Sequence, residues 1–248
     1  MAHDPFDTSR LIVENNRILV WDLPVRVFHW LLAISFTGAF ISAESERFRD
    51  IHVALGYTVV GLIAFRIVWA FVGSRYARLS SFAFGPRAVL EYVRSLLRFR
   101  PQHYIGHNPA GSWVIYLLIA LGLVTGITGY ATYNDFGGKW LEELHEGAAN
   151  TMLALVFVHI AGVVVSSLLH RENLVKAMVT GYKSGPAQAG IRGARWVTGF
   201  ALAAVVALLW TGAVDVPGLS AAPIAKERST QQHGERTHAR REAREHGG

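Results

Sequence analysis

Four histidines in this 248-residue chain lie within or at the edge of long apolar stretches, where a polar ring is costly. His29 is near the start of the first stretch, His52 opens the second, His145 opens the fourth, and His159 lies near the middle of the fourth. A histidine at that depth usually serves a function, although His159 could also be a buried ring bonded to a neighbouring helix. The other three, taken singly, suit rings at a membrane interface. Taken together, the four are enough for two sites with two imidazole ligands each.

The spacing of His145 and His159 indicates how one helix could serve both sites. The two residues are 14 positions apart, which is about 40° short of four full helical turns. Both rings therefore project from one face of a helix, separated by about 21 Å of rise. One helix could present ligands at two depths.

The stretches that carry these histidines have the length of membrane spans. The chain is 51% hydrophobic, and its apolar residues are concentrated in runs that are nearly free of charge. Each run is close to the ~20 residues that cross a bilayer as a helix. We therefore expect five transmembrane helices, at about 27–43, 51–72, 111–133, 147–169 and 196–214.

Lysine and arginine are distributed unevenly over the connections between these runs. Segment 73–110 has six and segment 170–195 has five, whereas 44–50 has two and 134–146 has one. The positive-inside rule then predicts a cytoplasmic N-terminus and a periplasmic C-terminus. The two outer connections carry seven acids against three bases. The net charge of +6 thus reflects topology, and we expect no nucleic-acid partner.

This orientation pairs the histidines by depth. His52 and His145 both lie toward the outer surface, which leaves His29 and His159 as an inner pair. The inner pairing is looser, because His159 is roughly 15 Å from the inner end of its helix while His29 is only a few residues into its own. His170 is a rival partner on the same face as His159. The alternative for His170 is a solvated ring among the headgroups.

Two imidazoles at each of two depths favour haem iron over zinc, which needs a tetrahedral set gathered at one point. The chain has no cysteine, which excludes disulfides, a covalent haem attachment motif and cysteine-ligated iron–sulfur clusters. Glycines in the histidine-bearing runs could leave room for a porphyrin, although small residues also serve ordinary helix packing: Gly56, Gly61, Gly122, Gly126, Gly129 and Gly162.

Two arginines could neutralise haem propionates. Arg66 follows His52 by 14 residues, as His159 follows His145, so Arg66 should lie near the depth of the inner site. We expect Arg66, together with Arg26, to pair with propionates of the inner haem. The alternative for Arg66 is a side chain that extends to the inner headgroups.

The remaining segments are assigned by composition. Residues 85–99 have an apolar and a basic face, which predicts an amphipathic helix that lies on the inner membrane surface or packs against the bundle. A Gly- and Pro-rich link at 181–186 precedes the fifth helix. The last ~30 residues are polar and poor in aromatic residues, so residues 215–248 are predicted to be disordered.

Several phrases together resemble the bacterial cytochrome b561 family, which includes the cytochrome b subunits of nickel–iron hydrogenases. They are "WDLPVRVFHW", "DIHVALGY", "RIVWAFVGSRYARL", "HYIGHNPAGSW" and "ELHEGAANTMLALVFVHIAGVVVSSLLHRENLVKAM", which span roughly residues 20–183. The resemblance implies an all-α integral membrane four-helix bundle that holds two haems b. It also implies that His29, His52, His145 and His159 are the axial ligands. On this basis, segment 1–20 is cytoplasmic, 21–183 is the haem domain, and 184–214 is a linker and a fifth transmembrane helix that the shortest members of the family lack.

The function implied by the resemblance is electron transfer at the bacterial inner membrane between the quinone pool and a partner redox protein. The partner is a soluble c-type cytochrome, which the acidic outer connections would attract, or a hydrogenase or dehydrogenase subunit. His103 and His107 could border a quinone, or they could organise the loop before a helix started by Asn108 and Pro109. Two other functions stay open: a membrane anchor and electron conduit with no substrate site of its own, and a transporter that uses its histidines for protons or metal ions.

Overall fold

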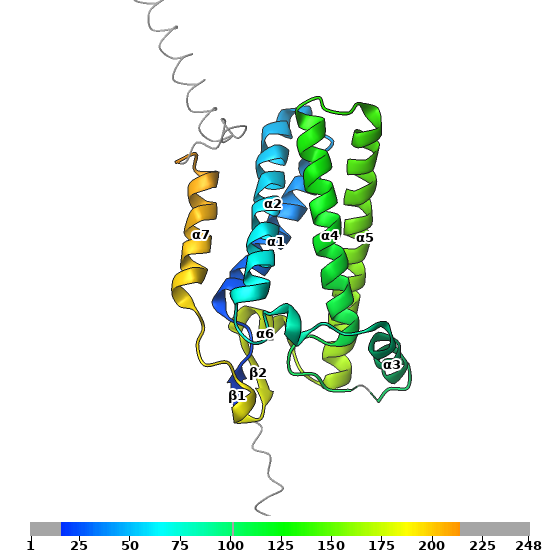
Figure 1. Cartoon of the computed structure of the whole chain (residues 1–248), viewed down its shortest axis with the longest axis vertical. Coiled ribbons are helices and arrows are strands. Elements are labelled where there is room, and N and C mark those ends of the chain that lie inside the picture. Colours follow the sequence, from blue (N-terminus) through cyan, green and yellow to red (C-terminus); the bar gives the residue numbers. More distant parts are fainter. Residues whose placement is uncertain (1–15, 101, 214–248) are drawn as a thin grey trace, which may run out of the picture.

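The computed structural model describes residues 16–100 and 102–213, and most of them are helical. Four long apolar helices form a bundle: α1 (Leu23–Ser42), α2 (Arg49–Val72), α4 (Pro109–Tyr133) and α5 (Lys139–His170) (Figure 1). Each is long and apolar enough to cross a membrane. The all-α membrane bundle predicted from the sequence is therefore confirmed, and the predicted disordered tail at 215–248 lies outside the described residues.

The bundle consists of two helical hairpins. α1 packs along α2, and α4 packs along α5. α2 also contacts α4, where Leu118 and Leu121 of α4 pack against a buried apolar cluster. The buried members of this cluster are Phe36 on α1, Val59 and Ile63 on α2, and Met152 on α5. In contrast, α5 has few contacts with α1 or α2. The helix that carries His145 and His159 is thus held mainly by α4, and its buried contact with the other hairpin is at Met152, between the two histidines.

The helices are longer than the charge-free runs, because charged residues at their ends are part of them. α1 starts at Leu23, four residues before the predicted span. Asp22 caps it by accepting the N–H of Val25, and Pro24 occupies its first turn. α5 continues from Lys139 to His170 and ends in a left-handed residue, Arg171.

A small folded layer covers the lower end of the bundle in Figure 1. Strand β1 (Asn16–Leu19) pairs antiparallel with β2 (Tyr182–Gly185), and α6 (Leu174–Thr180) lies beside them. Trp21, Trp69 and Ala177 are in the buried core of this layer. The sheet was not predicted from the sequence, in which 181–186 has the composition of a Gly- and Pro-rich link. A four-residue strand next to glycines gives too short an alternating pattern to be recognised without its partner.

Helix α3 (Pro86–Leu97) is the predicted amphipathic helix and lies beside the lower ends of α4 and α5 (Figure 1). Tyr92 is buried where α3 packs on α4, and its ring contacts that of Tyr104 in the following loop. Leu90, Val93 and Leu97 are exposed on another face. The helix therefore packs on the bundle with one face and still offers a second apolar face to its surroundings.

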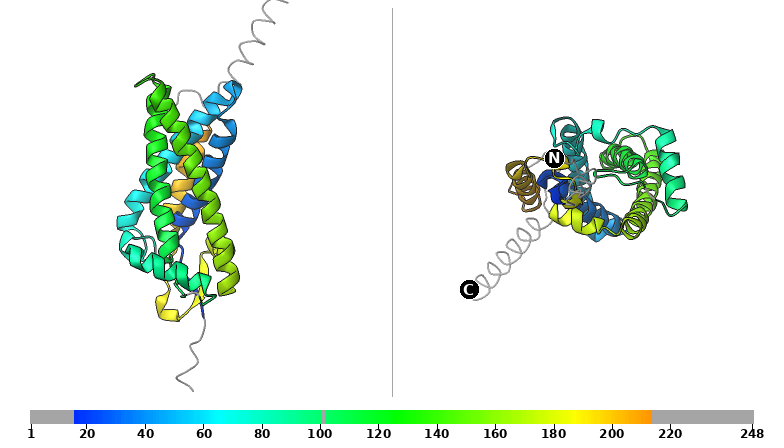
Figure 2. Two further views of the ribbon diagram at one scale, coloured as in Figure 1. Left: turned by 90° about the vertical axis from the view of Figure 1, so that its right-hand side faces the viewer. Right: turned by 90° about the horizontal axis from the view of Figure 1, so that it is seen from below.

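Helix α7 (Trp196–Trp210) lies at the edge of the bundle beside α1, away from α4 and α5 (Figure 2). Val206 packs on Phe28 and Leu62, and Trp210 donates a hydrogen bond to Thr58 at 3.0 Å. The predicted helix 196–214 starts where expected, but it ends four residues early. Its 15 residues cover about 22 Å, which is less than the hydrocarbon thickness, so a fifth full span stays a prediction.

Candidate functional site

The fold brings the four histidines together as two facing pairs. His52 on α2 faces His145 on α5, with ring centres 6.1 Å apart, and we call these two residues the upper pair. His29 on α1 faces His159 on α5, with ring centres 6.4 Å apart, and these form the lower pair. Each pair lies between α5 and a helix of the other hairpin. The side chains expected to pair by depth are therefore neighbours across the interior of the bundle.

The lower pair forms because the helices start and end at different levels. α5 extends eleven residues beyond His159 and reaches the level of α3, whereas α1 starts higher, above the β1–β2 layer (Figure 1). The roughly 15 Å offset inferred from the sequence assumed that both helices end at the same level. The lower part of α5 lies below the start of α1, so no tilt is needed to close the gap.

The ring separations fit a metal between the two imidazoles of each pair. An imidazole centre is roughly 1.1 Å from its own nitrogen, so two metal–nitrogen bonds of about 2 Å in line place the centres about 6 Å apart. A direct hydrogen bond between the rings would bring them about 1 Å closer. The separations of 6.1 and 6.4 Å therefore agree with a ligand pair, and both pairs share this property.

Hydrogen bonds orient the rings of the upper pair. Nδ1 of His52 lies 2.8 Å from the carbonyl oxygen of Ala39, and Nδ1 of His145 lies 2.9 Å from that of Thr125. A carbonyl only accepts, so Nδ1 donates in both cases and the lone pair is on Nε2. Imidazole ligands of metals are commonly oriented by such a second bond. Both upper rings thus have one nitrogen ready for a metal.

The lower pair has a different environment. Nδ1 of His29 is buried and has no hydrogen-bond partner among the described residues, and Trp30 packs edge-on against the ring. A buried nitrogen without a partner is rare in a folded protein, because it loses its hydration and gains nothing. The lower site therefore positions its rings by packing.

The donor set around each pair does not fit zinc. Within residues 16–100 and 102–213, no three side chains of His, Cys, Asp or Glu come together as a metal cluster. Two facing imidazoles are the axial ligands that a haem iron takes, with the porphyrin supplying the other four nitrogens. The residues present thus fit haem at both pairs.

The glycines divide into two groups. A Cβ on Gly122 would lie 2.3 Å from Ile63, and one on Gly126 would lie 2.3 Å from Val60, so these two glycines let α4 approach α2. A Cβ on Gly56, Gly61 or Gly162 would meet nothing within 4 Å. Only this second group is next to open space, as room for a porphyrin requires. Gly129 is a separate case, since its Cβ would lie 2.8 Å from the ring of His145.

Arg66 is buried at the lower end of α2, with 4% of its surface exposed. Its guanidinium donates to the carbonyl of Ala77 at 3.1 Å and lies 5.5 Å from the centre of the Phe82 ring. His107 lies close enough to both Arg66 and His159 for each of them to lower its pKa. Arg66 is therefore in the neighbourhood of the lower pair, and it forms no ion pair with a carboxylate in the described part of the chain.

Arg26 has a different setting. Its guanidinium donates a hydrogen bond to the carbonyl of Val179, at the C-terminal end of α6, where a cation interacts favourably with the helix dipole. Its Nε is buried without a partner. The guanidinium of Arg26 is thus bonded to the backbone of α6, and its pairing with a propionate stays a prediction.

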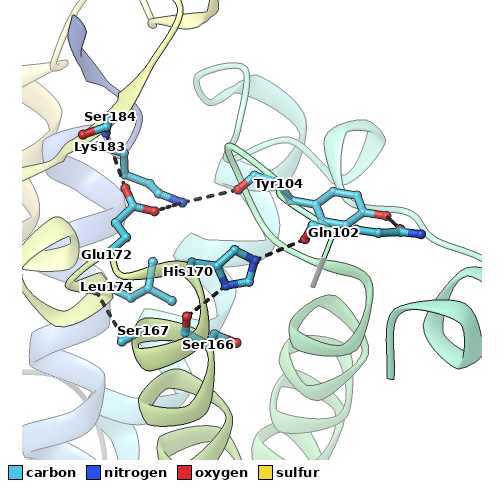
Figure 3. A network of polar contacts seen from close by, with 9 residues as sticks. All are labelled: Gln102, Tyr104, Ser166, Ser167, His170, Glu172, Leu174, Lys183 and Ser184. Carbon is cyan, nitrogen blue, oxygen red and sulfur yellow. Dashed lines mark hydrogen bonds and ion pairs between the residues drawn. The ribbon is translucent and has the colours of Figure 1, made fainter. Parts of the chain in front are cut away.

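The remaining histidines near the lower end make contacts of their own. His107 lies between Trp21 and Phe82, with ring centres 4.7 and 4.8 Å away. Burial, and then Arg66, Lys183 and His159, lower the pKa of His107 to about 3, so its ring is neutral. Both ring nitrogens of His170 contact backbone carbonyls, of Ser166 at 2.9 Å and of Gln102 at 3.2 Å (Figure 3). His170 therefore has no free nitrogen for a metal.

A residue that was not predicted from the sequence ties the lower ends of α1 and α2 together. Asp22 is fully buried, caps α1 and accepts a hydrogen bond from the indole of Trp69 at 3.1 Å. An aspartate just before Leu-Pro is a recognisable helix start, so this signal was present in "WDLP". Its contact with Trp69, 47 residues away, was not recognisable from the sequence.

A bundle of four apolar helices with facing imidazoles between them is the architecture of a membrane-bound b-type cytochrome. The sequence comparison gives the same answer, since the model of the prokaryotic cytochrome b561 family matches residues 20–181. The chain belongs to this family of membrane electron-transport proteins, whose cofactor is haem b. Helix α7 lies outside the matched region.

Curated relatives cover most of the same region. The chain is 29% identical to a probable Ni/Fe-hydrogenase B-type cytochrome subunit of Rhodobacter capsulatus, over 72% of this chain and 87% of the relative. The corresponding subunit of Rhizobium leguminosarum bv. viciae is 26% identical, over 68% and 90%. That of hydrogenase 1 of Escherichia coli strain K12 is 25% identical, over 66% and 90%. No solved structure matches the chain.

Proposed function

We propose that this chain is a di-haem cytochrome that moves electrons across the membrane, with one haem b at the upper pair and one at the lower pair. The observation that carries the proposal is the geometry of the two pairs: both have ring separations suited to a shared metal, and both use α5. A bound haem accepts and releases one electron at a time, and its potential is set by its ligands and surroundings. His145 and His159 hold the two sites about 21 Å apart along α5.

The protein contributes orientation, burial and charge. His52 and His145 offer Nε2 because backbone carbonyls hold their Nδ1 protons. Arg66 supplies a buried cation close to the lower pair, which suits a propionate. All four histidines are partly buried between the helices.

The lower end of the bundle is proposed to face the cytoplasm, because it holds the basic connections 73–108 and 171–195. The upper end, with its seven acids, then faces the periplasm of the bacterial inner membrane. Electrons would pass between a partner at the upper end and quinone at the lower end.

The proposed partner at the upper end is a hydrogenase-like subunit, as the names of the relatives suggest. A soluble c-type cytochrome is the second candidate. The seven acids in the connections 44–50 and 134–146 favour it, because negative charge attracts a basic protein. Co-purification from native membranes separates the two. A stable complex with an iron–sulfur or hydrogenase subunit supports the first, and no stable partner combined with salt-sensitive electron exchange supports the second.

Neutralising three of these seven acids sharpens this test. The triple variant Glu142→Gln, Glu143→Gln and Glu146→Gln should slow electron exchange with a basic cytochrome at low ionic strength if that protein is the partner. An unchanged rate, with no dependence on salt, contradicts the c-type cytochrome.

The experiment that tests the haem assignment is a haem count per chain by pyridine haemochrome. We expect two haems in the wild type and one in each of His29→Ala, His159→Ala, His52→Ala and His145→Ala. His170→Ala is the matched control and should keep two. A wild type without haem contradicts the proposal and favours transport, and loss of haem in the His170 variant moves the lower ligand to that residue.

A further inference from the structure

A basic cavity of about 970 Å³ lies at the lower end of the bundle, apart from the histidine pairs. Its walls come from β1, β2, α6, the end of α5 and the loop before α4. The side chains that matter here are Arg17, His103, His170, Arg171, Lys176 and Lys183. Glu172 supplies the one carboxylate among the residues that line the cavity.

An internal ion pair neutralises part of this charge. Lys183, with 4% of its side chain exposed, lies 3.1 Å from Glu172, and its ammonium also contacts the carbonyl of Tyr104 (Figure 3). Burial lowers the pKa of His103, and Lys183 adds to this effect, so His103 is not a cation at neutral pH. The Lys183–Glu172 ion pair forms part of the cavity wall and contributes no net charge to the cavity.

Three cations remain after this pairing. Arg17, Arg171 and Lys176 line the cavity, and none of them forms an ion pair in the described part of the chain. The guanidinium of Arg17 is held over the ring of Tyr182, 4.3 Å from its centre. The cavity therefore has a surplus of about three positive charges, which suits an anion.

An apolar groove adjoins this cavity. The groove has a volume of about 330 Å³ and runs along the last turns of α5 to the start of α6, where Val164, Leu168 and Val175 line it. It shares Arg171, Glu172 and Asn173 with the basic cavity. The three apolar side chains are half exposed or more, at 50%, 72% and 51%. The groove is thus open toward the apolar surroundings of the bundle.

We propose that the cavity and the groove together bind one anionic phospholipid, with its phosphate headgroup in the cavity and an acyl chain in the groove. Basic pockets where helices leave the membrane are typical sites for such headgroups. A zwitterionic lipid would bring a cation against the surplus positive charge. A free phosphate would leave the groove unused. This proposal goes beyond electron transfer and does not depend on the haem assignment.

Native mass spectrometry of the full chain in detergent tests the proposal, with phosphatidylglycerol and phosphatidylcholine as probes at equal concentration. We expect the wild type to retain phosphatidylglycerol preferentially. The double variant Arg17→Gln and Lys176→Gln should bind it roughly thirtyfold more weakly, since each cation near a membrane surface contributes about a factor of five. The matched control is Arg94→Gln and Arg98→Gln at the C-terminal end of α3, at the same end of the bundle but outside the cavity, which should bind as the wild type does.

Two further measurements separate a lipid from its headgroup alone. Val175→Trp fills the groove from an exposed position and should weaken phosphatidylglycerol binding by about tenfold at unchanged haem content. Inorganic phosphate at millimolar concentration should not displace the lipid. Equal retention of the two lipids, equal loss in the α3 control, or full displacement by phosphate each overturns the proposal.

Discussion

The two histidine pairs are alike in geometry and different in surroundings. The ring separations differ by only 0.3 Å, between 6.1 and 6.4 Å. Yet both upper rings donate to backbone carbonyls, while Nδ1 of His29 in the lower pair has no partner in the described part of the chain. The same ligand geometry is thus built once by hydrogen bonds and once by packing.

The charges around the two pairs also differ, and their expected effect on a bound iron has the same direction as the effect of the hydrogen bonds. Glu142 and Glu146 lie within one turn of His145, whereas Arg66 and His107 lie near the lower pair. Acids and more basic imidazole ligands both stabilise ferric iron, and a buried cation stabilises ferrous iron. With a haem at each pair, as proposed, these two features favour a lower potential at the upper site, so that electrons would pass from the upper to the lower pair.

The largest effect is expected from Gly129→Ala. Its Cβ would lie 2.8 Å from Cε1 of His145 and 3.0 Å from Nδ1, so the ring must move and lose its bond to Thr125. The haem count should fall from two toward one, with the lower haem retained. Gly147→Ala, also in a helix but with nothing within 4 Å of its Cβ, is the control. Two haems with unchanged spectra in Gly129→Ala would show that the ring position is not critical.

The second-largest effect is expected from Arg66→Ala. Removal of a buried cation should lower the potential of the lower haem by roughly 40–80 mV and reduce its occupancy, with the upper haem unchanged. Spectroelectrochemical titration measures both haems. Arg66→Lys keeps the charge and should retain most of the potential. If occupancy and potential are the same as in the wild type, Arg66 is not a propionate partner.

The hydrogen bonds of the upper rings account for a smaller part of the difference between the two sites in the wild type. A net hydrogen bond of about 1 kcal/mol corresponds to roughly 40 mV for one electron, so the upper haem should titrate at least that far below the lower haem. His29→Ala leaves the upper haem and His145→Ala leaves the lower haem, which assigns each potential. The opposite order would reverse the inferred direction of electron flow.

The smallest effect is expected from Thr128→Val. The hydroxyl of Thr128 lies 3.4 Å from Nδ1 of His145, a long contact beside the shorter one to the carbonyl of Thr125. Its loss should shift the upper potential by about 10 mV and leave the lower one unchanged. A shift of the lower haem instead would mean that the change spreads through the packing of α4.

The sequence by itself determined the membrane bundle and its candidate ligands. Charge-free runs have the length of spans, and a histidine inside such a run is too costly to be incidental. The period of a helix also places His145 and His159 on one face. These are local properties, so they can be recognised from neighbouring residues alone.

Only the tertiary structure decided how the ends of the helices meet. The offset between His29 and His159 disappeared because α5 extends past the start of α1, and the β1–β2 pairing joins residues more than 160 positions apart. The burial of Asp22 against Trp69 and the shared edge of the basic cavity and the apolar groove are likewise contacts between distant segments. Such contacts depend on where helices end and cross, which no short stretch of sequence specifies.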